Sequence, residues 1–544
     1  MDTVLRISEI MRRVCEFAED DTLAKLARSA WILHEPAIQI LWTELPNITP
    51  LLRCFPEDAW EPEGRYLRFS RALAPKDWTA FLKYSSIVRV IGQNLSNHNT
   101  SAYIYHSNTW PTMCAFRPTI ILFPNLRSLN WRQLGLNDDT FPSFLLSVGQ
   151  SLEVLRLLPR PPSFNDAKSS TALQVAFQII AERFHHLRSL VVDQLWIFDR
   201  MDLGLESAIT SLALSLSSLE SLICPRVPIT IRAATALAQL AALKDLTMYL
   251  SDDAQWSTFS PDDLEPFKKL QTITLYITIP AYVSFGNALQ LPHVNEVTIA
   301  LCQYSEPHSI PGFFSSIRRQ FSPSALKKLM ICPTRGATGV GLARTPELTI
   351  LPSHLRPLLE FKLMEDFTLS LHYGTSLEDT LLSDMATAWP KLRSLSIYCQ
   401  DHVGARLHAS ETLPTIKVLA KLAMRCPDLR SIGLCGINAA CWPTLAEFEA
   451  DQAAQDLLNQ LQQSPSPSQL QTLDFAMSPI TAPECVAIFL AHAFPALSCV
   501  DYNYDRHFTR EDSWRRVSFL LSQIQRIKQS AGQSISSGTS GEGS

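Results

Sequence analysis

The sequence predicts an α/β solenoid, with parallel strands on the inside and helices on the outside, that follows a small domain of three helices. Three observations carry this prediction. A six-residue apolar pattern recurs along most of the chain, amphipathic helical segments separate its copies, and the first fifty residues follow a different pattern. Self-similarity at a spacing of about 20–50 residues is typical of solenoids and propellers.

The recurring pattern is apolar-x-x-apolar-x-apolar, and it occurs thirteen times between Leu126 and Tyr502. Within each copy the fourth and sixth residues alternate with polar ones, as in a short strand that is buried on one face. Neighbouring copies are 24 to 41 residues apart, which leaves room for one strand and one helix. The copies begin at Leu126, Leu152, Leu187, Leu219, Leu243, Leu270, Val294, Leu326, Met364, Leu392, Leu429, Leu470 and Leu497.

Helical segments fill the intervals between the copies. Residues 171–184, 230–242, 413–426 and 481–494 each place apolar side chains three and four residues apart, as amphipathic helices do. Since consecutive strand–helix units pack side by side through right-handed connections, we expect strands in the order of the sequence. Their shared core should contain Leu246, Leu275, Leu329, Leu395 and Leu473.

These units resemble the leucine-rich-repeat family, in its longer form with full helices, over about residues 80–528. The Asn or Cys that the family carries at the ninth position is missing almost throughout, and only Cys302 fits. The resemblance predicts about 13–14 units in residues 76–508, with an early one at 87–92. Residues 509–528 should form a capping helix, and 529–544, which are poor in apolar residues, should be disordered.

Residues 1–50 predict three short helices. Ile10, Val14 and Phe17 share a face of the first helix, Asp20 and Asp21 precede the second, and the third is expected to start at Glu35-Pro36. Residues 51–75 are expected to be a linker.

Residues 5–45 resemble an F-box, in the version that precedes leucine-rich repeats in many fungal proteins. The matching features are Ile7 before Glu9-Ile10, the acidic pair before Leu23, and the terminal Leu41-Trp42-x-x-Leu45. Two motifs depart from the family. Its usual Leu-Pro opening is Ile7-Ser8 here, and its Val-Cys-x-x-Trp stretch is replaced by residues 29–33.

The resemblance implies a substrate-recognition subunit of an SCF-type (cullin–RING) ubiquitin ligase. The N-terminal helices would bind the Skp1-type adaptor, and the solenoid would bind a target protein. The expected adaptor-binding residues, some of which must instead hold the three helices together, are Ile7, Ile10, Val14, Leu23 and Leu26.

Two alternatives stay open. In the first, the chain is a leucine-rich-repeat scaffold or inhibitor unconnected with ubiquitin, whose residues 1–45 pack on the first repeats through Leu41, Trp42 and Leu45. In the second, it is a leucine-rich-repeat GTPase activator, for which Arg132, Arg156 and Arg160 are candidates by position.

Composition argues against several other classes. A net charge of −5 does not favour a nucleic-acid partner. The chain starts without an apolar signal core and has no run of 18 apolar residues, so we expect no membrane span and a cytoplasmic or nuclear location. Twelve cysteines without zinc spacing, and the absence of phosphate-loop or hydrolase motifs, predict no metal, no cofactor and no enzymatic activity.

The outward strand positions are the candidates for target binding. If the fourth and sixth residues of each copy point inward, the fifth and seventh line the exposed strand face. The fifth positions are Asn130, Arg156, Thr247, Thr274, Thr298, Thr368, Ser396, Asp474 and Asp501 among others. The expected target-binding residues are Tyr249, Tyr276, Tyr398, Asp474 and Asp501. Tyr249 should neighbour Tyr276, and Asp474 should neighbour Asp501 in a pair that favours a basic partner.

Overall fold

The structure is a computed structural model of the chain. It describes residues 8–64, 66–92, 104–106, 108–131, 140–157, 167–192, 205–250, 256, 266–302, 309–334, 349–371, 374–399, 413–434, 436–464, 468–474, 478–501 and 511–538. The chain divides into two compact units. Unit 1 comprises residues 1–251 and 261–270, and unit 2 comprises residues 252–260 and 271–544.

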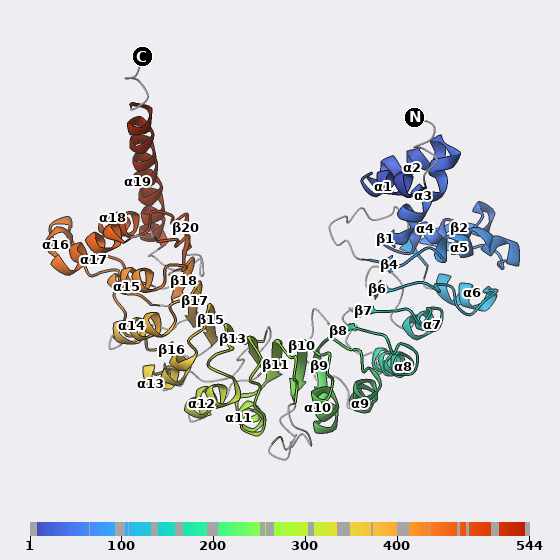
Figure 1. Ribbon diagram of the computed structural model, residues 1–544, viewed down its shortest axis with the longest axis horizontal. Helices are drawn as coiled ribbons and strands as arrows, with labels where there is room; N and C mark the ends of the chain where they lie inside the picture. The colour runs from blue at the N-terminus through green and yellow to red at the C-terminus, as the bar shows by residue number, and fades with distance from the viewer. Residues whose placement is uncertain are drawn as a thin grey trace. The chain divides into compact units, whose positions relative to one another are not determined.

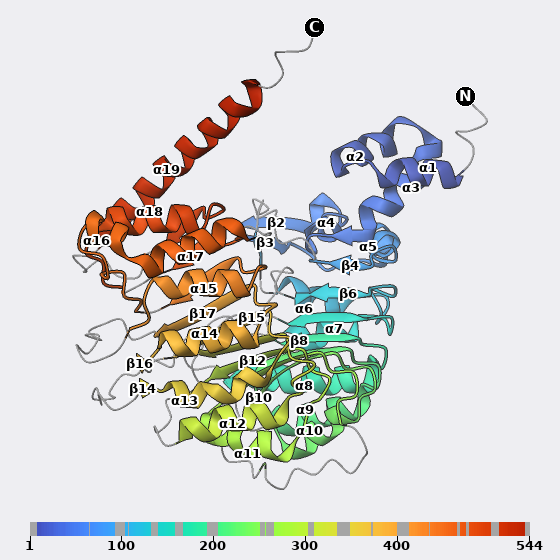
Figure 2. The same ribbon diagram turned by 60° about the vertical axis from the view of Figure 1, so that its left-hand side comes forward.

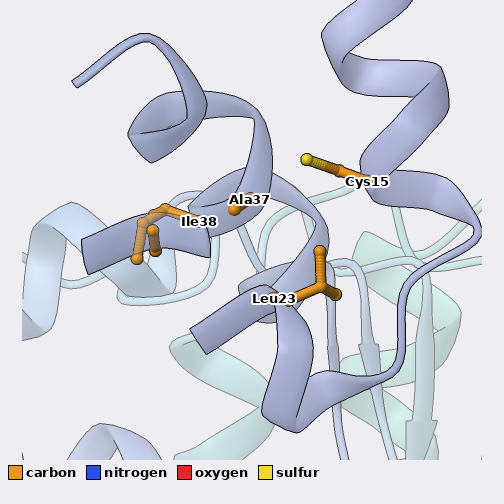
Figure 3. Close-up of a cluster of buried hydrophobic side chains, with 5 residues drawn as sticks. Cys15, Leu23, Ala37 and Ile38 are labelled. Carbon is orange, nitrogen blue, oxygen red and sulfur yellow. The ribbon is translucent and has the colours of Figure 1, made fainter. Parts of the chain in front are cut away.

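Unit 1 begins with three helices, α1 (Ser8–Glu16), α2 (Asp20–Ser29) and α3 (Trp31–Thr43). Their side chains meet in a buried cluster of Cys15, Leu23, Ala27, Ala37 and Ile38, part of which Figure 3 shows. The third helix starts at Trp31 rather than at Glu35, so the predicted start was wrong and Pro36 lies inside the helix. A first turn closes before the proline because the Ala30 carbonyl accepts from the backbone N–H groups of residues 33 and 34.

Residues 51–75, expected to be a linker, contain regular structure. The elements that lie in or overlap this segment are α4 (Thr49–Leu52), η2 (Glu57–Ala59), β2 (Trp60–Glu63), β3 (Tyr66–Phe69) and η3 (Pro75–Asp77), and α5 (Trp78–Ser85) follows it. Strands β2 and β3 form an antiparallel hairpin, to which β5 (Ile104–Tyr105) adds. The ring of Phe55 packs against those of Trp60, Phe69, Trp78 and Phe81, with centroids 5.0 to 6.4 Å away. This aromatic cluster holds the segment in place.

The rest of unit 1 is a strand–helix solenoid. Its parallel strands follow one another in sequence order: β1 (Glu44–Leu45), β4 (Val90–Ile91), β6 (Ser128–Asn130), β7 (Val154–Leu157), β8 (Ser189–Val192), β9 (Ser221–Ile229) and β10 (Asp245–Leu250). Figure 1 shows the helices on one side of these strands: α6 (Thr109–Phe116), α7 (Phe141–Leu146), α8 (Ala167–Arg183), α9 (Leu205–Ser215) and α10 (Ile231–Ala238).

Unit 2 repeats this arrangement. Its parallel strands are β11 (Thr272–Ile277), β12 (Glu296–Leu301), β13 (Lys328–Pro333), β15 (Asp366–Leu371), β17 (Ser394–Cys399), β18 (Ser431–Leu434), β19 (Thr472–Asp474) and β20 (Cys499–Asp501). The short strands β14 (Thr349–Ile350) and β16 (Gly374–Thr375) pair separately.

The helices of unit 2 cover one side of its sheet. They are α11 (Ile279–Ala288), α12 (Ile310–Gln320), α13 (Pro352–Leu355), η8 (Arg356–Glu360), α14 (Asp379–Ala388), α15 (Lys417–Arg425), α16 (Leu445–Ala450), α17 (Gln452–Gln463), α18 (Pro483–Ala493) and α19 (Glu511–Gly538). Figure 2 shows α19 extending past α18. Because α19 continues to Gly538, the first ten residues of the predicted disordered tail are helical.

The strand register confirms the predicted solenoid. Within each unit, neighbouring strands of the sheet pair at equal positions of the pattern, as in Leu275 opposite Ile299 and Ile299 opposite Ile331. The fourth and sixth positions point into the core, and all five leucines that were predicted to be buried are buried. Each such side chain contributes about 1.5–3 kcal/mol by leaving water, so this ladder dominates the stability of the sheet.

Charged side chains at the second position follow the ladder along the edge of the sheet. From β6 to β10 these residues alternate in sign, as Arg127, Glu153, Arg188, Glu220 and Lys244. Ion pairs join Arg127 to Glu153 at 3.6 Å and Lys244 to Glu220 at 2.7 Å. Exposed pairs of this kind contribute only about 0–1 kcal/mol each.

The inward register can be tested by a pair of substitutions on one strand. Leu275→Ala should lower the free energy of unfolding by about 2–5 kcal/mol, because it leaves a cavity in the core. Thr274→Ala, on the exposed face of the same strand, should cost much less. Urea unfolding with hydrogen exchange would measure both. Equal small losses would contradict the register described here.

Candidate protein-binding surfaces

The first helix carries an apolar patch that the three-helix cluster does not cover. Ile10, Val14 and Phe17 are 38%, 49% and 78% exposed, and together with Arg13 they line a shallow groove. Ile10 and Val14 lie four residues apart and share one face of α1, and Phe17 follows in the turn just after the helix ends at Glu16. Ile10, Arg13, Val14 and Phe17 are named here the α1 patch. The Arg13 guanidinium lies over the Phe17 ring, 5.1 Å from its centroid, and pairs with Glu16 at 2.7 Å.

The α1 patch exists because α1 is apolar on two faces. Met11 and Cys15 are buried, and they fix the helix on its neighbours. Ile10, Val14 and Phe17 then point away from the cluster. A helix that is apolar beyond its buried face presents surface for a further contact, and a groove rimmed by a charged side chain is typical of a protein-binding surface.

The other predicted adaptor-binding residues have different surroundings. Leu23 is buried in the cluster and Leu26 packs against it, so both hold the helices together. Ile7 lies outside the described residues. Trp31 at the start of α3 is 91% exposed and stacks on His34, and neither it nor Phe17 was among the predicted adaptor-binding residues.

The N-terminal helices also join the solenoid. The Trp42 ring stacks on the Tyr84 ring with centroids 4.2 Å apart. Leu45 of β1 lies opposite Ile91 of β4, which makes β1 the first strand of the sheet in unit 1. The three helices are therefore attached at the end of α3, and the α1 patch lies on another helix.

The second surface is the strand face of unit 2, on the side that the helices leave open. The register aligns the fifth positions of the pattern in one row. The row reads Thr274, Thr298, Met330, Thr368, Ser396, Gly433, Asp474 and Asp501. Asp474 lies directly opposite Asp501, so these two predicted target-binding residues are neighbours. Met330, which was not predicted as a site residue, is 43% exposed in the middle of the row.

Unit 1 holds one exception to the predicted strand face. Asn130 occupies a fifth position but is buried, and its side-chain amide donates to the Gly92 carbonyl at 3.2 Å. The expectation that Asn130 lines an exposed face was therefore wrong, because this amide is used within the fold.

The predicted tyrosines are all half-buried at strand ends. Tyr398 lies across Gly433 of the neighbouring strand. A Cβ atom on residue 433 would come 1.8 Å from the Tyr398 hydroxyl oxygen, so only glycine leaves room for this ring. Tyr249 belongs to unit 1 and Tyr276 to unit 2, and their predicted proximity stays a prediction.

Three charged residues lie side by side at the third positions of unit 2. Lys328 of β13 is opposite both Glu296 of β12 and Asp366 of β15. The Lys328 ammonium is 2.9 Å from the Glu296 carboxylate. Burial raises the pKa of the Asp366 carboxyl above its usual value, while the nearby Lys328 opposes that change.

The surroundings of the candidate metal-binding, nucleophilic and cationic side chains can be given for the described parts of the chain. No three His, Cys, Asp or Glu side chains there are placed to hold a metal ion. Burial raises the pKa of the Cys54 thiol to about 11 and that of Cys426 to about 12, so both are protonated at neutral pH and poor nucleophiles. Arg156 is exposed on β7, while Arg132 and Arg160 lie outside the described residues. Among the helices that could be inspected, none has the length and apolar character to cross a bilayer.

Comparison with known proteins gives structural matches alone. No protein-family model and no curated protein matches this sequence. An internalin (inlF) from Listeria monocytogenes matches 71% of this chain and 82% of its own length, at 13% identity and a TM-score of 0.33. The leucine-rich repeat-containing protein LegL7 from Legionella pneumophila matches 70% of this chain and 94% of its own length, at 14% identity and a TM-score of 0.25. A chain in a structure of the yeast Rad7 and Elc1 complex matches 69% of this chain and 84% of its own length, at 13% identity and a TM-score of 0.31. Matches at this level carry no functional inference.

The contact between Tyr398 and Gly433 predicts an energetic coupling. Gly433→Ala forces the ring away and should cost about 1–3 kcal/mol of unfolding free energy, as overpacking does. In a Tyr398→Ala background the same substitution should cost almost nothing. Thermal and urea unfolding of the wild type, the two single variants and the double variant would measure this double-mutant cycle. An equal cost in both backgrounds would exclude the contact.

The raised pKa of Asp366 predicts how stability changes with pH. A carboxyl whose pKa is raised by folding contributes stability below its unfolded pKa, near 3.8, and loses that contribution as the pH rises through the folded pKa. At pH 7 the ionised Asp366 is therefore less favourable in the fold than a neutral group of the same size. Asp366→Asn should unfold at the same or a higher temperature than the wild type at pH 7. This difference in unfolding temperature should disappear in acid. Thermal unfolding of both proteins at pH 7 and in acid would measure it. A variant that unfolds at a lower temperature than the wild type at pH 7 would contradict the prediction.

Proposed function

We propose that this chain is the substrate-recognition subunit of an SCF-type ubiquitin ligase, acting in the cytoplasm or the nucleus. Its α1 patch would bind the Skp1-type adaptor that links it to the cullin–RING ligase, and its strand faces would bind a target protein. The chain itself would carry out no bond chemistry. Its contribution would be proximity, because a bound target lysine meets the ubiquitin-loaded enzyme at a high effective concentration.

The observation that carries this proposal is the α1 patch. Three apolar side chains, two on α1 and one in the turn that follows it, line one groove and are exposed in a domain that has its own buried cluster. A partner that covers them would remove their remaining exposed apolar surface from water, which stabilises the bound state. The resemblance of residues 5–45 to an F-box supplies the identity of that partner.

The alternative of a scaffold or inhibitor unconnected with ubiquitin also has an observation in its favour. The stack of Trp42 on Tyr84 and the pairing of β1 with β4 are what a helical cap on the first repeats requires. A simple cap, however, has no need of an exposed patch on α1. The α1 patch therefore favours the adaptor-binding subunit.

Copurification with a Skp1-type adaptor and a cullin would test the proposal. The full-length chain should recover both, whereas the double variant Ile10→Glu, Val14→Glu should recover neither, because two carboxylates in the apolar groove oppose its burial. The unfolding temperature of the variant should be unchanged, since both positions are exposed.

Leu214→Glu provides the matched control. Leu214 is an apolar residue of α9 that is 59% exposed and lies outside the α1 patch. This variant should recover adaptor and cullin as the wild type does. Failure of the wild-type chain to recover the adaptor, or equal recovery by the double variant, would refute the proposed function.

A further inference from the structure

Cations outnumber carboxylates at the edge of unit 1 where its strands begin, although the chain as a whole is acidic. The edge is formed by the second position of each repeat and by the two residues before the repeat. Between Arg89 and Lys269 its charged residues are six cations and two carboxylates, Arg89, Arg127, Arg188, Lys244, Lys268, Lys269, Glu153 and Glu220. These eight residues are named the basic edge. The whole chain, in contrast, has 47 Lys and Arg against 52 Asp and Glu.

Backbone hydrogen bonds place most of the basic edge in one continuous row. Each backbone N–H of the row donates to the carbonyl of the preceding member at 2.7 or 2.8 Å. The members, in order, are Arg89, Arg127, Glu153, Arg188, Glu220 and Lys244. Neighbouring strands lie about 4.8 Å apart, so adjacent side chains of this row are close enough to contact the same partner.

The cations of the row extend further into solvent than the carboxylates do. The Lys244 ammonium is 2.7 Å from the Glu220 carboxylate, and the Arg188 guanidinium is 3.9 Å from it. The side chains of Arg188 and Lys244 are 62% and 47% exposed, against 35% for Glu220. The hydrogen bond from Lys244 lowers the pKa of the Glu220 carboxyl, and the charges of Arg188 and Lys269 lower it further. One carboxylate therefore lies among three cations, and an approaching partner meets the cations first.

This pattern of charge suits an acidic protein segment better than a nucleic acid. Arg127, Arg188 and Lys244 lie on every second strand, about 10 Å apart, with a carboxylate in each interval. A nucleic acid strand carries a phosphate about every 3.4 Å along its axis, so its phosphates would also face Glu153 and Glu220. In a protein segment, neutral residues can separate the acidic ones and lie against these two carboxylates.

We propose that the basic edge binds an acidic segment of the target protein, whose Asp or Glu side chains face Arg127, Arg188 and Lys244. This inference rests on the proposed function and deepens it, because it names the class of target. The edge borders the open strand face of unit 1, since Lys244 directly precedes Asp245 at a third position, so one target can contact both. The excess positive charge would also speed the encounter with an acidic partner.

Selection of random dodecapeptides, displayed on phage, against the immobilised full-length chain would test the inference. The selected peptides should be enriched in Asp and Glu, and because they carry no phosphate, the selection measures the contribution of these residues alone. Fluorescence anisotropy should show that the triple variant Arg188→Gln, Lys244→Gln, Lys269→Gln binds them about tenfold more weakly. Glu220→Gln, which removes a repelling charge, should bind them more tightly, and binding by the wild type should weaken as salt is raised.

A second triple variant removes the same number of charges from other places. Lys25, Arg232 and Lys421 are exposed and lie outside the basic edge, so Lys25→Gln, Arg232→Gln, Lys421→Gln should leave the affinity close to that of the wild type. Since the substituted positions of both triple variants are exposed, their unfolding temperatures should stay close to that of the wild type. A twelve-nucleotide oligothymidylate should bind the wild type more weakly than the selected peptides do.

Three results would overturn the inference. They are selected peptides without enrichment in acidic residues, an equal loss of affinity in the two triple variants, and tighter binding of the oligothymidylate than of the peptides. Adaptor capture on the same proteins separates this inference from the proposed function. Acidic-peptide binding that depends on the basic edge, in a chain unable to capture the adaptor, would support the edge and refute the ubiquitin-ligase role.

Discussion

The stacking of apolar side chains from one strand onto the same positions of the next is the interaction on which the rest of the structure depends. Leu275, Ile299 and Ile331 are buried in one such row. A shift by a single residue would exchange the buried and exposed faces of a strand, so the core alone fixes the register. The alignment of Met330, Thr368 and Asp474 on the open face is a consequence of packing on the opposite side of the sheet.

The repeat region was predictable from sequence because its strands share one six-residue apolar pattern, whereas residues 51–75 do not carry it. The six-residue pattern predicted the strands, their order and the residues that point inward. Residues 51–75 have no such period, and their structure depends on aromatic contacts between Phe55 and rings up to 26 residues away in sequence. The start of α3 was missed because Pro36 suggested a helix N-terminus, although a preceding turn at Ala30 is equally compatible with it.

The candidate surfaces were predictable in part. Helical spacing placed Ile10, Val14 and Phe17 on one face, but it could not reveal which of the two apolar faces of α1 is buried. That choice depends on where Cys15 meets Leu23 of the next helix. The role of Gly433 was also hidden, because the need for glycine arises from Tyr398, which is distant in sequence and adjacent only across two paired strands.

The alternating charges at the edge of unit 1 constrain how such an array can change in length. Loss of the unit that contains Glu153 would bring Arg127 beside Arg188, and like charges opposite each other destabilise a sheet. Loss of two consecutive units would instead bring Arg127 beside Glu220 and restore attraction. By this electrostatic criterion, the removal of two neighbouring units from this part of the chain costs less than the removal of one.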